Sequence, residues 1–210
     1  MKTLISVSFY ILLLSVISCS TSTEPDEPIY NWEKIEIQDE GTVYSFYGGL
    51  DDFVLIGTSG SILKSTDSGE NWRKVYSVPY YVRQFIQKAD TIFALAGHED
   101  YFSLDGGESW EKSANVKKYD KVNKVTSLSG IKYQLEPQFQ GTLAQPTLVL
   151  ESKNGENWKE IFPFNHYIYS IHIDNNDRLY LGINGWEWDE ERNSFDPNSN
   201  NNAIIYYTKN

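Results

Sequence analysis

The segment Ser65-Thr66-Asp67-Ser68-Gly69-Glu70-Asn71-Trp72 decides the fold, because related segments follow it twice along the chain. The second copy is SLDGGESW at residues 103–110, and the third is ESKNGENW at residues 151–158. The first two copies share the pattern Ser-x-Asp-x-Gly-x-x-Trp, whereas the third has Glu151 in place of Ser and Lys153 in place of Asp. A pattern that returns after roughly 40 residues indicates a repeat architecture.

Each copy has the chemistry of a tight turn between two strands. An Asp side chain bonds nearby backbone N–H groups, Gly permits positive φ, and the Trp ring covers the turn. The turn residues are Ser65, Asp67, Gly69 and Trp72 in the first copy, Ser103, Asp105, Gly107 and Trp110 in the second, and Gly155 and Trp158 in the third. We expect the third turn to be looser, with its register kept by the Gly and the Trp.

The sequence between the copies alternates with a period of two and is rich in β-branched and aromatic residues, which predicts strands. The expected strands are 42–46, 53–57, 62–65 and 73–76, then 82–86, 91–95, 101–103 and 110–112, then 122–128, 132–135, 147–150 and 158–162, and finally 167–171, 178–181 and 204–207. No segment carries a helical stripe. The domain is therefore expected to be all-β.

The two ends of the chain are complementary in this pattern. Residues 31–35 repeat the sequence at 157–161, so the chain begins with a fourth strand, and it ends after a third strand. Because the strand missing at one end is present at the other, we expect a ring of four blades in which the N-terminal strand completes the last blade. This arrangement leaves no exposed sheet edge in that blade. A larger ring built from two chains, or a shortened gene product, is the alternative.

The repeat resembles the Asp-box, or BNR, repeat of sialidase-like and sortilin-like β-propellers, and the resemblance covers nearly all of residues 29–210. It implies a small β-propeller of about four four-stranded blades. In such a blade, the first-to-second and third-to-fourth turns lie on one face. The Asp-boxes are then structural turns of that face.

The first residues have the pattern of a bacterial lipoprotein. Residues 1–18 combine Lys2 with a short apolar run, which predicts a cleaved signal peptide, the alternative being an uncleaved anchor. The sequence Val16-Ile17-Ser18-Cys19 resembles a lipobox, which implies a diacylglyceryl group on Cys19, the only cysteine. Residues 19–28 are a polar tether. We therefore expect a lipid-anchored protein of the cell envelope, with the outer membrane as its predicted location.

The formal charge of −11 excludes some partners. Nucleic acid needs Lys and Arg to meet its phosphates, so it is not an expected ligand. An anionic membrane surface would repel the chain, so we expect only the lipid to hold it there.

The irregular loops fall on the face opposite the Asp-boxes, including long ones at 136–146 and 185–202. Aromatic and charged side chains on loops of a rigid scaffold are typical of binding sites. The candidate ligand residues are Tyr80, Tyr81, Arg83, His98, Tyr101, His166, Tyr167, Trp186 and Trp188. A protein or glycan of the envelope is the expected partner. Alternatively, Trp186 and Trp188 have a structural role and pack as a lid over the small ring.

Enzymatic functions are less favoured. The resemblance to sialidases would imply three arginines at one site. The sequence has four arginines, and one of them, Arg73, lies beside an Asp-box, on the face opposite the irregular loops. Two alternative functions remain. One is a small glycoside hydrolase that uses a pair of carboxylates among Glu99, Asp100, Asp189 and Glu190. The other is an envelope assembly factor like the photosystem-associated propellers. No catalytic residue or cofactor is assigned. The acidic loop 189–196 is a weak calcium candidate, because it lacks the alternation of an EF-hand.

Overall fold

The computed structural model describes residues 30–114 and 121–209 of the 210-residue chain. Within these ranges the regular structure consists of eighteen β-strands, which confirms the all-β prediction. The same ranges hold no helix long and apolar enough to cross a membrane. The predicted signal peptide, Cys19 and the tether up to residue 28 lie outside the described residues.

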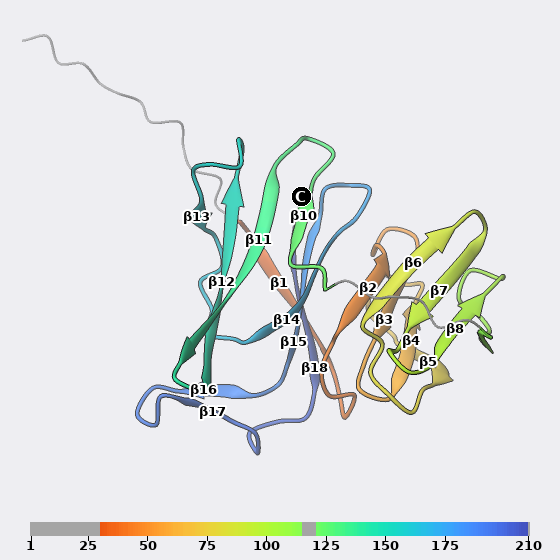
Figure 1. The fold of residues 1–210 in the computed structure, drawn as a ribbon, viewed down its shortest axis with the longest axis horizontal. Coiled ribbons are helices and arrows are strands. Elements are labelled where there is room, and N and C mark those ends of the chain that lie inside the picture. The colour runs from red at the N-terminus through yellow and green to blue at the C-terminus, as the bar shows by residue number, and fades with distance from the viewer. Residues whose placement is uncertain (1–29, 115–120, 210) are drawn as a thin grey trace, which may run out of the picture.

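Sixteen of the strands form four antiparallel four-stranded sheets, arranged as the blades of a β-propeller (Figure 1). Blade 1 is β2 (Ser45–Gly48), β3 (Val54–Gly57), β4 (Ser61–Ser65) and β5 (Arg73–Ser77); blade 2 is β6 (Gln84–Lys88), β7 (Thr91–Leu95), β8 (Asp100–Ser103) and β9 (Glu111–Lys112). Blade 3 is β10 (Lys124–Thr126), β11 (Lys132–Gln140), β12 (Leu143–Ser152) and β13 (Lys159–Glu160); blade 4 is β14 (Ile168–Ile173), β15 (Leu179–Asn184), β18 (Ala203–Thr208) and β1 (Trp32–Ile37).

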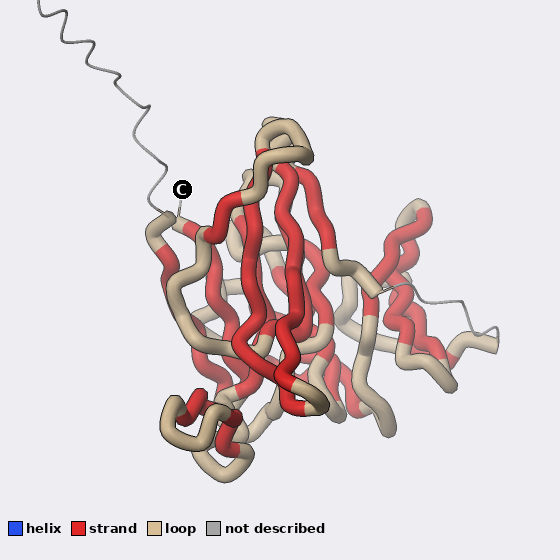
Figure 2. The backbone as a smooth tube through the Cα atoms, turned by 60° about the vertical axis from the view of Figure 1, so that its left-hand side comes forward, coloured by secondary structure: helices blue, strands red, loops and turns tan. Residues whose placement is uncertain are grey.

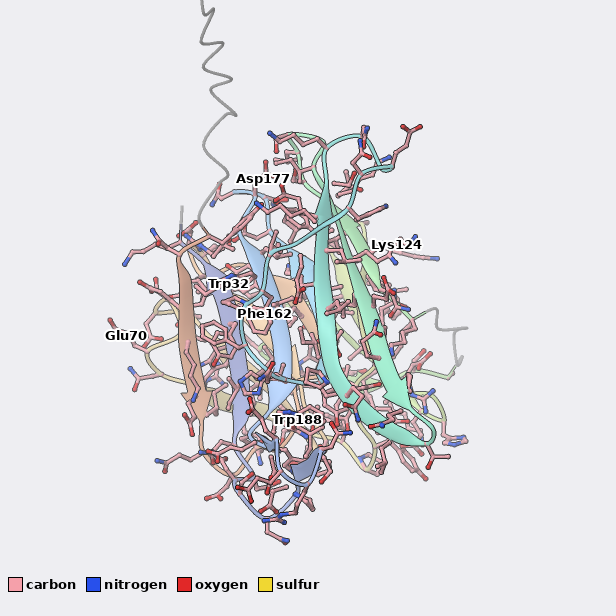
Figure 3. The ribbon with its side chains drawn as sticks, turned by 90° about the vertical axis from the view of Figure 1, so that its left-hand side faces the viewer. Trp32, Glu70, Lys124, Phe162, Asp177 and Trp188 are labelled. Carbon is pink, nitrogen blue, oxygen red and sulfur yellow. The ribbon has the colours of Figure 1, made fainter. Side chains whose placement is uncertain are left out.

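The N-terminal strand completes blade 4, as the phase of the two chain ends predicts. β1 runs antiparallel to β18, with Trp32 opposite Thr208 and Ile37 opposite Ala203. The Trp32 ring also reaches blade 3, where its Nε1 donates to the carbonyl of Ile161 at 3.1 Å and its ring meets Phe162 edge-on (Figure 3). β1 therefore binds two blades at once.

Apolar side chains from neighbouring blades form the core. The described residues contain three such clusters, which lie between blades 1 and 2, blades 1 and 4, and blades 3 and 4. In each blade, the strand nearest the centre of the propeller lines one central cavity. Phe85 of blade 2 and Val125 of blade 3 therefore line the same cavity. Closure of the ring between blades 2 and 3 stays a prediction.

The two long loops expected on the face opposite the repeats contain strands. The period of two continues through residues 132–140 and 143–152, so the segment 136–146 is the end of the β11–β12 hairpin, with a bulge between Glu136 and Gln138. Residues 185–202 contain a small hairpin of β16 (Glu187–Asp189) and β17 (Ser194–Asp196), which packs beside β12 (Figure 2). We call the face that carries these hairpins the loop face, and the opposite face the turn face.

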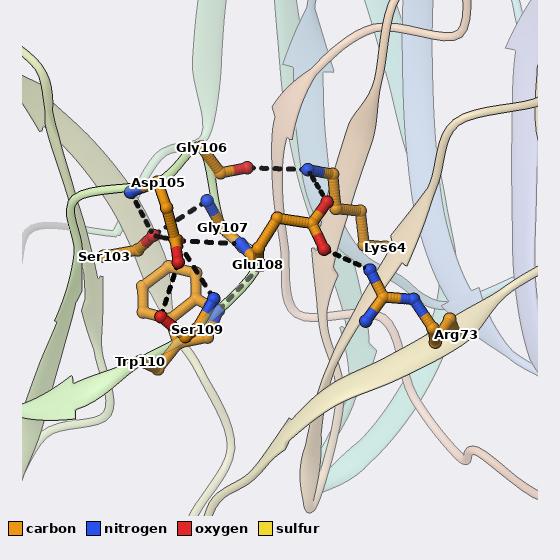
Figure 4. Close-up of polar contacts among 9 residues, drawn as sticks. All are labelled: Lys64, Arg73, Ser103, Asp105, Gly106, Gly107, Glu108, Ser109 and Trp110. Atoms are coloured by element: carbon orange, nitrogen blue, oxygen red, sulfur yellow. Dashed lines mark hydrogen bonds and ion pairs between the residues drawn. The ribbon is translucent and has the colours of Figure 1, made fainter.

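The repeated segments join the third and fourth strands of their blades on the turn face. In the first, Gly69 N–H donates to Ser65 Oγ (3.0 Å), Asn71 N–H donates to Asp67 (2.9 Å), and Trp72 Nε1 donates to the Gly69 carbonyl (3.0 Å). The second repeats these contacts through the equivalent Ser103, Asp105, Gly107, Ser109 and Trp110 (Figure 4). Repeated sequence therefore gives repeated hydrogen bonding.

The third turn corrects the sequence alignment. Ser152, not Glu151, accepts the Gly155 N–H (2.8 Å), and Asn154, not Lys153, accepts from the N–H groups of Glu156 and Asn157 at 2.9 and 3.1 Å. The segment is one residue shorter between the Asx residue and the glycine, which displaces the Ser and Asx positions. The turn keeps the hydrogen bonds made by its Ser and Asx side chains.

The second turn also connects two blades. Lys64 of β4 is buried, and its Nζ donates to the Gly106 carbonyl (2.9 Å) and to Glu108 (2.7 Å), which also pairs with Arg73 (Figure 4). Gly107 has φ +86°, and a Cβ there would lie 2.8 Å from Leu55 of blade 1. Only glycine allows this turn to approach the neighbouring blade so closely.

Candidate functional site

The central cavity opens on the loop face, where the first strands of the four blades begin. It has a volume of about 270 Å³ and is lined by side chains from all four blades. Three tyrosines mark its mouth, Tyr44 before β2, Tyr81 before β6 and Tyr169 in β14. We call it the tyrosine cavity. Concave, partly apolar sites of this size are typical ligand sites.

The tyrosines belong to a row of aromatic rings that crosses the loop face. Tyr44 lies 4.6 Å from Tyr81 and 5.4 Å from Tyr169 between ring centroids, and Tyr169 lies 5.0 Å from Tyr167. The row continues into the β16–β17 hairpin, since Tyr167 lies 6.5 Å from Phe195, and Phe195 lies 4.9 Å from Trp188. We call these six residues the aromatic row.

Among the described residues, the charged side chains that line the tyrosine cavity are basic, although the chain as a whole is acidic. Lys121 is exposed at the rim. Arg83 is half-buried, with its guanidinium 4.7 Å from the centre of the Tyr81 ring and one N–H donated to the Tyr81 hydroxyl at 2.7 Å. Stacking and hydrogen bonding together fix the direction of this guanidinium.

Deeper in the cavity, the polar side chains bond backbone carbonyls. Ser45 donates to the Val82 carbonyl and Ser170 donates to the Val43 carbonyl, both at 2.8 Å, and each bond joins two blades. His172 donates from Nε2 to the Gly48 carbonyl at 2.8 Å. Burial lowers the pKa of His172, so this ring is neutral at pH 7 and adds no charge.

A second cavity, of about 340 Å³, opens on the turn face and has the opposite charge. Among the described residues, Asp51, Asp52 and Asp174 line it together with the His172 ring that it shares with the tyrosine cavity. Arg178 lies 3.1 Å from Asp51 and 3.7 Å from Asp174, so part of this negative charge is paired. Of the two cavities, the tyrosine cavity is therefore the more favourable one for an anion.

The structure brings some of the predicted ligand residues together and separates others. Tyr81, Arg83, Tyr167 and Trp188 lie in or beside the aromatic row. Tyr80 is exposed, and its ring centre lies 5.4 Å from that of the exposed His98. Trp186 is half-buried, and its backbone N–H donates to the Asn184 side chain.

Tyr101 and His166 pack inward. Tyr101 is 3% exposed and belongs to the core between blades 1 and 2, because its ring packs on Tyr76 of blade 1 at 5.1 Å. Burial lowers the pKa of His166 to about 4, and its ring packs on Tyr206 at 5.5 Å. Tyr101 is therefore not an exposed ligand residue, and His166 is a neutral packing residue at pH 7.

Sequence reasoning missed Tyr44, Tyr169, Lys121 and Phe195. Tyr44 and Tyr169 stand within alternating segments and were expected to be strand residues only. The available signal was their place at the beginnings of first strands, which converge at the centre of a propeller. Lys121 and Phe195 carried no pattern of their own.

Two of the four carboxylates considered for glycoside hydrolysis, Glu99 and Asp189, have structural partners. Glu99 pairs with Lys112 and accepts from Tyr101, and both bonds lower its pKa. Asp189 accepts from Arg192, which lowers the pKa of Asp189 as well. A general acid needs a raised pKa, so neither carboxylate is tuned for that role.

The acidic loop 189–196 is arranged around Arg192. This guanidinium lies 2.7 Å from Asp189 and 4.0 Å from Asp196. Throughout residues 30–114 and 121–209, no group of three or more His, Asp or Glu side chains is placed to hold a metal ion.

Fold and site together define a β-propeller with an aromatic, basic cavity at one end. No family model matches the chain, and no curated protein matches it. Among solved structures, it is similar to YCF48 from Cyanidioschyzon merolae, at 15% identity and a TM-score of 0.35, over 71% of this chain and 52% of that one. YCF48 bound to D1 peptide is 13% identical, with a TM-score of 0.35 over 80% of this chain and 72% of that one.

An ancestral GH74 enzyme is also similar, at 15% identity and a TM-score of 0.32, over 80% of this chain and 27% of that one. All three are β-propeller proteins. This chain spans about half the length of the first of them. The similarity concerns the fold alone.

Proposed function

We propose that this protein is a non-catalytic binding module of the bacterial cell envelope, which binds a protein or glycan partner through its loop face. The aromatic row is the observation that carries the proposal. It joins six rings from three blades and a projecting hairpin, and three of them, Tyr44, Tyr81 and Tyr169, line the tyrosine cavity. Aromatic side chains gathered on the loops of a rigid scaffold are typical of binding surfaces. Aromatic side chains of this kind dominate binding energy in protein interfaces.

The repeat turns support a scaffold role for the turn face. Their Ser, Asx and Gly residues are engaged in hydrogen bonds within the turns, which agrees with their assignment as Asp-boxes. The lowered pKa values of Glu99 and Asp189 argue against either carboxylate as the general acid of a glycoside hydrolase.

Replacing Tyr81 and Trp188 together by Ala is expected to reduce capture of the envelope partner at least tenfold. The reason is that both rings lie on the aromatic row and neither belongs to the described core clusters. The measurement is crosslinking in intact cells, quantified as the fraction of the protein joined to its partner. Leu104→Ala is the matched control, because Leu104 is 69% exposed in the second repeat turn.

Equal crosslinking of the double variant and wild type would refute a ligand role for the aromatic row. Thermal unfolding of both variants separates this result from loss of fold.

The proposal also includes anchoring by lipid on Cys19, which rests on the lipobox-like sequence at 16–19. Cys19→Ser is expected to abolish labelling by a fatty-acid probe and to release the protein from the membrane fraction. Ser18→Ala is the control, since a small residue before the cysteine is retained. Continued labelling of the Cys19→Ser protein would contradict the anchor.

A further inference from the structure

The tyrosine cavity is amphiphilic, and its two parts lie at different depths. Its basic side chains, Arg83 and Lys121, lie at the mouth with the tyrosine hydroxyls. Its deeper wall is made by Phe46, Phe85 and Ile171, each less than one tenth exposed. A ligand that fills it must therefore present negative charge outward and apolar surface inward.

Arg83 is oriented before any ligand arrives. The Tyr81 ring stacks on the guanidinium, and the backbone of Gly97 packs behind it, where a Cβ would lie 3.5 Å from Arg83 Cζ. Gly97 has φ +87°, so a side chain there would be strained as well as crowded. A planar guanidinium held in this way suits the two oxygens of a carboxylate, with which it can make paired hydrogen bonds.

The deeper wall disfavours a sugar. A pyranose carries hydroxyl groups around its edge, and each one buried without a partner costs about 1–3 kcal/mol. Three of the polar side chains that line the cavity, Ser45, Ser170 and His172, already give a proton to a backbone carbonyl. Among the described lining residues this leaves Gln84 as the main neutral hydrogen-bonding side chain, which is too little for a ring of hydroxyl groups. An apolar side chain meets no such cost and gains about 25 cal/mol for each Å² that it buries.

We propose that the tyrosine cavity binds a carboxylate joined to an apolar group, with the carboxylate between Arg83 and Lys121 and the apolar group against Phe46, Phe85 and Ile171. This is the chemistry of a polypeptide C-terminus with a hydrophobic last residue, and of a free apolar carboxylic acid. The inference rests on the proposed function only in placing ligand binding on the loop face.

The test is a calorimetric or NMR titration of the full chain with N-acetylphenylalanine and with its neutral analogue, N-acetylphenylalaninamide. The acid is expected to bind at least about tenfold more tightly than the amide, since only the acid pairs with the guanidinium. Arg83→Gln is expected to reduce that difference and to leave only the part that Lys121 contributes. Arg73→Gln is the matched control, because it makes the same charge change at the turn face, where Arg73 pairs with Glu108.

Two further probes distinguish the sources of the carboxylate. Tighter binding of acetyl-Gly-Ser-Phe than of 3-phenylpropionate supports a polypeptide C-terminus, and the reverse order supports a free acid. Equal affinity for acid and amide, no binding of the acid, or an unchanged preference in Arg83→Gln would overturn the proposal.

The proposed partner surface and the proposed carboxylate site can be rejected independently of each other. Loss of partner capture in the Tyr81 and Trp188 double variant, without any binding of the acid, would retain the loop face and reject the carboxylate. Acid binding with unaffected capture would retain the cavity ligand and reject the aromatic row as the partner surface.

Discussion

Deletion of residues 30–38 is expected to leave the protein unfolded at room temperature. The deletion removes β1, whose Trp32, Ile35 and Ile37 side chains pack in the cores on both sides of blade 4. Burial of a side chain of this size contributes about 1.5–3 kcal/mol, so three of them approach the 5–15 kcal/mol that stabilises an ordinary domain. The ladder of hydrogen bonds to β18 is lost as well.

Circular dichroism and NMR signal dispersion measure this outcome. Deletion of residues 20–28 is the control, because it removes nine residues of the predicted tether and none of the described strands. The truncated chain should regain native dispersion when a peptide of residues 30–38 is added, since β18 then recovers its partner. A cooperative unfolding transition at the wild-type temperature, without the peptide, would show that β1 is dispensable.

Replacement of Asp174 by Ala is expected to destabilise the fold by about 3–5 kcal/mol. Asp174 is buried where blade 4 meets blade 1, and its carboxylate accepts from the N–H groups of Asn176 (2.8 Å) and Arg178 (3.0 Å) and from the Tyr180 hydroxyl (2.7 Å). The Tyr180 oxygen in turn accepts from Leu50 N–H of blade 1 at 3.0 Å. Alanine leaves these donors buried without the acceptor, and each such group costs about 1–3 kcal/mol.

Urea unfolding measures the change in the free energy of unfolding. Asp51→Ala is the matched control, since Asp51 pairs with Arg178 in the same network but its side chain is 52% exposed, and an exposed pair contributes about 0–1 kcal/mol. Equal losses in the two variants would show that burial of Asp174 does not decide its contribution.

The blades could be predicted from the sequence because each is a local unit with its own turn. The spacing of Trp32, Trp72, Trp110 and Trp158 set the blade size, and the complementary ends placed β1 in blade 4. The third turn was misaligned by one residue because Ser152 and Asn154 lie one position nearer to their Trp than in the other copies. Residues 136–146 are predicted as a loop, although the alternation of polar and apolar residues continues into them and the strands pair on both sides of Gly141.

The site was less predictable because it is made by tertiary convergence. Tyr81, Arg83 and Tyr167 were found since they lie on connections between blades. Tyr44 and Tyr169 were missed because the alternating pattern explains them equally well as wall residues. Only the arrangement of the blades brings Tyr44 within 4.6 Å of Tyr81, across 37 residues of chain.

The direction of β1 has a consequence for how the molecule would stand at a surface. β1 enters blade 4 at Trp32, beside Thr208 at the turn face, and leaves at Ile37, beside Ala203 at the loop face. Figure 3 shows Asp177 and Trp188 at opposite ends of the molecule, the first on the turn face and the second on the loop face. A lipid on Cys19 would hold the turn face toward the bilayer within a ten-residue tether, at most about 35 Å. The tyrosine cavity would then point outward, membrane-distal and unobstructed by the lipid headgroups.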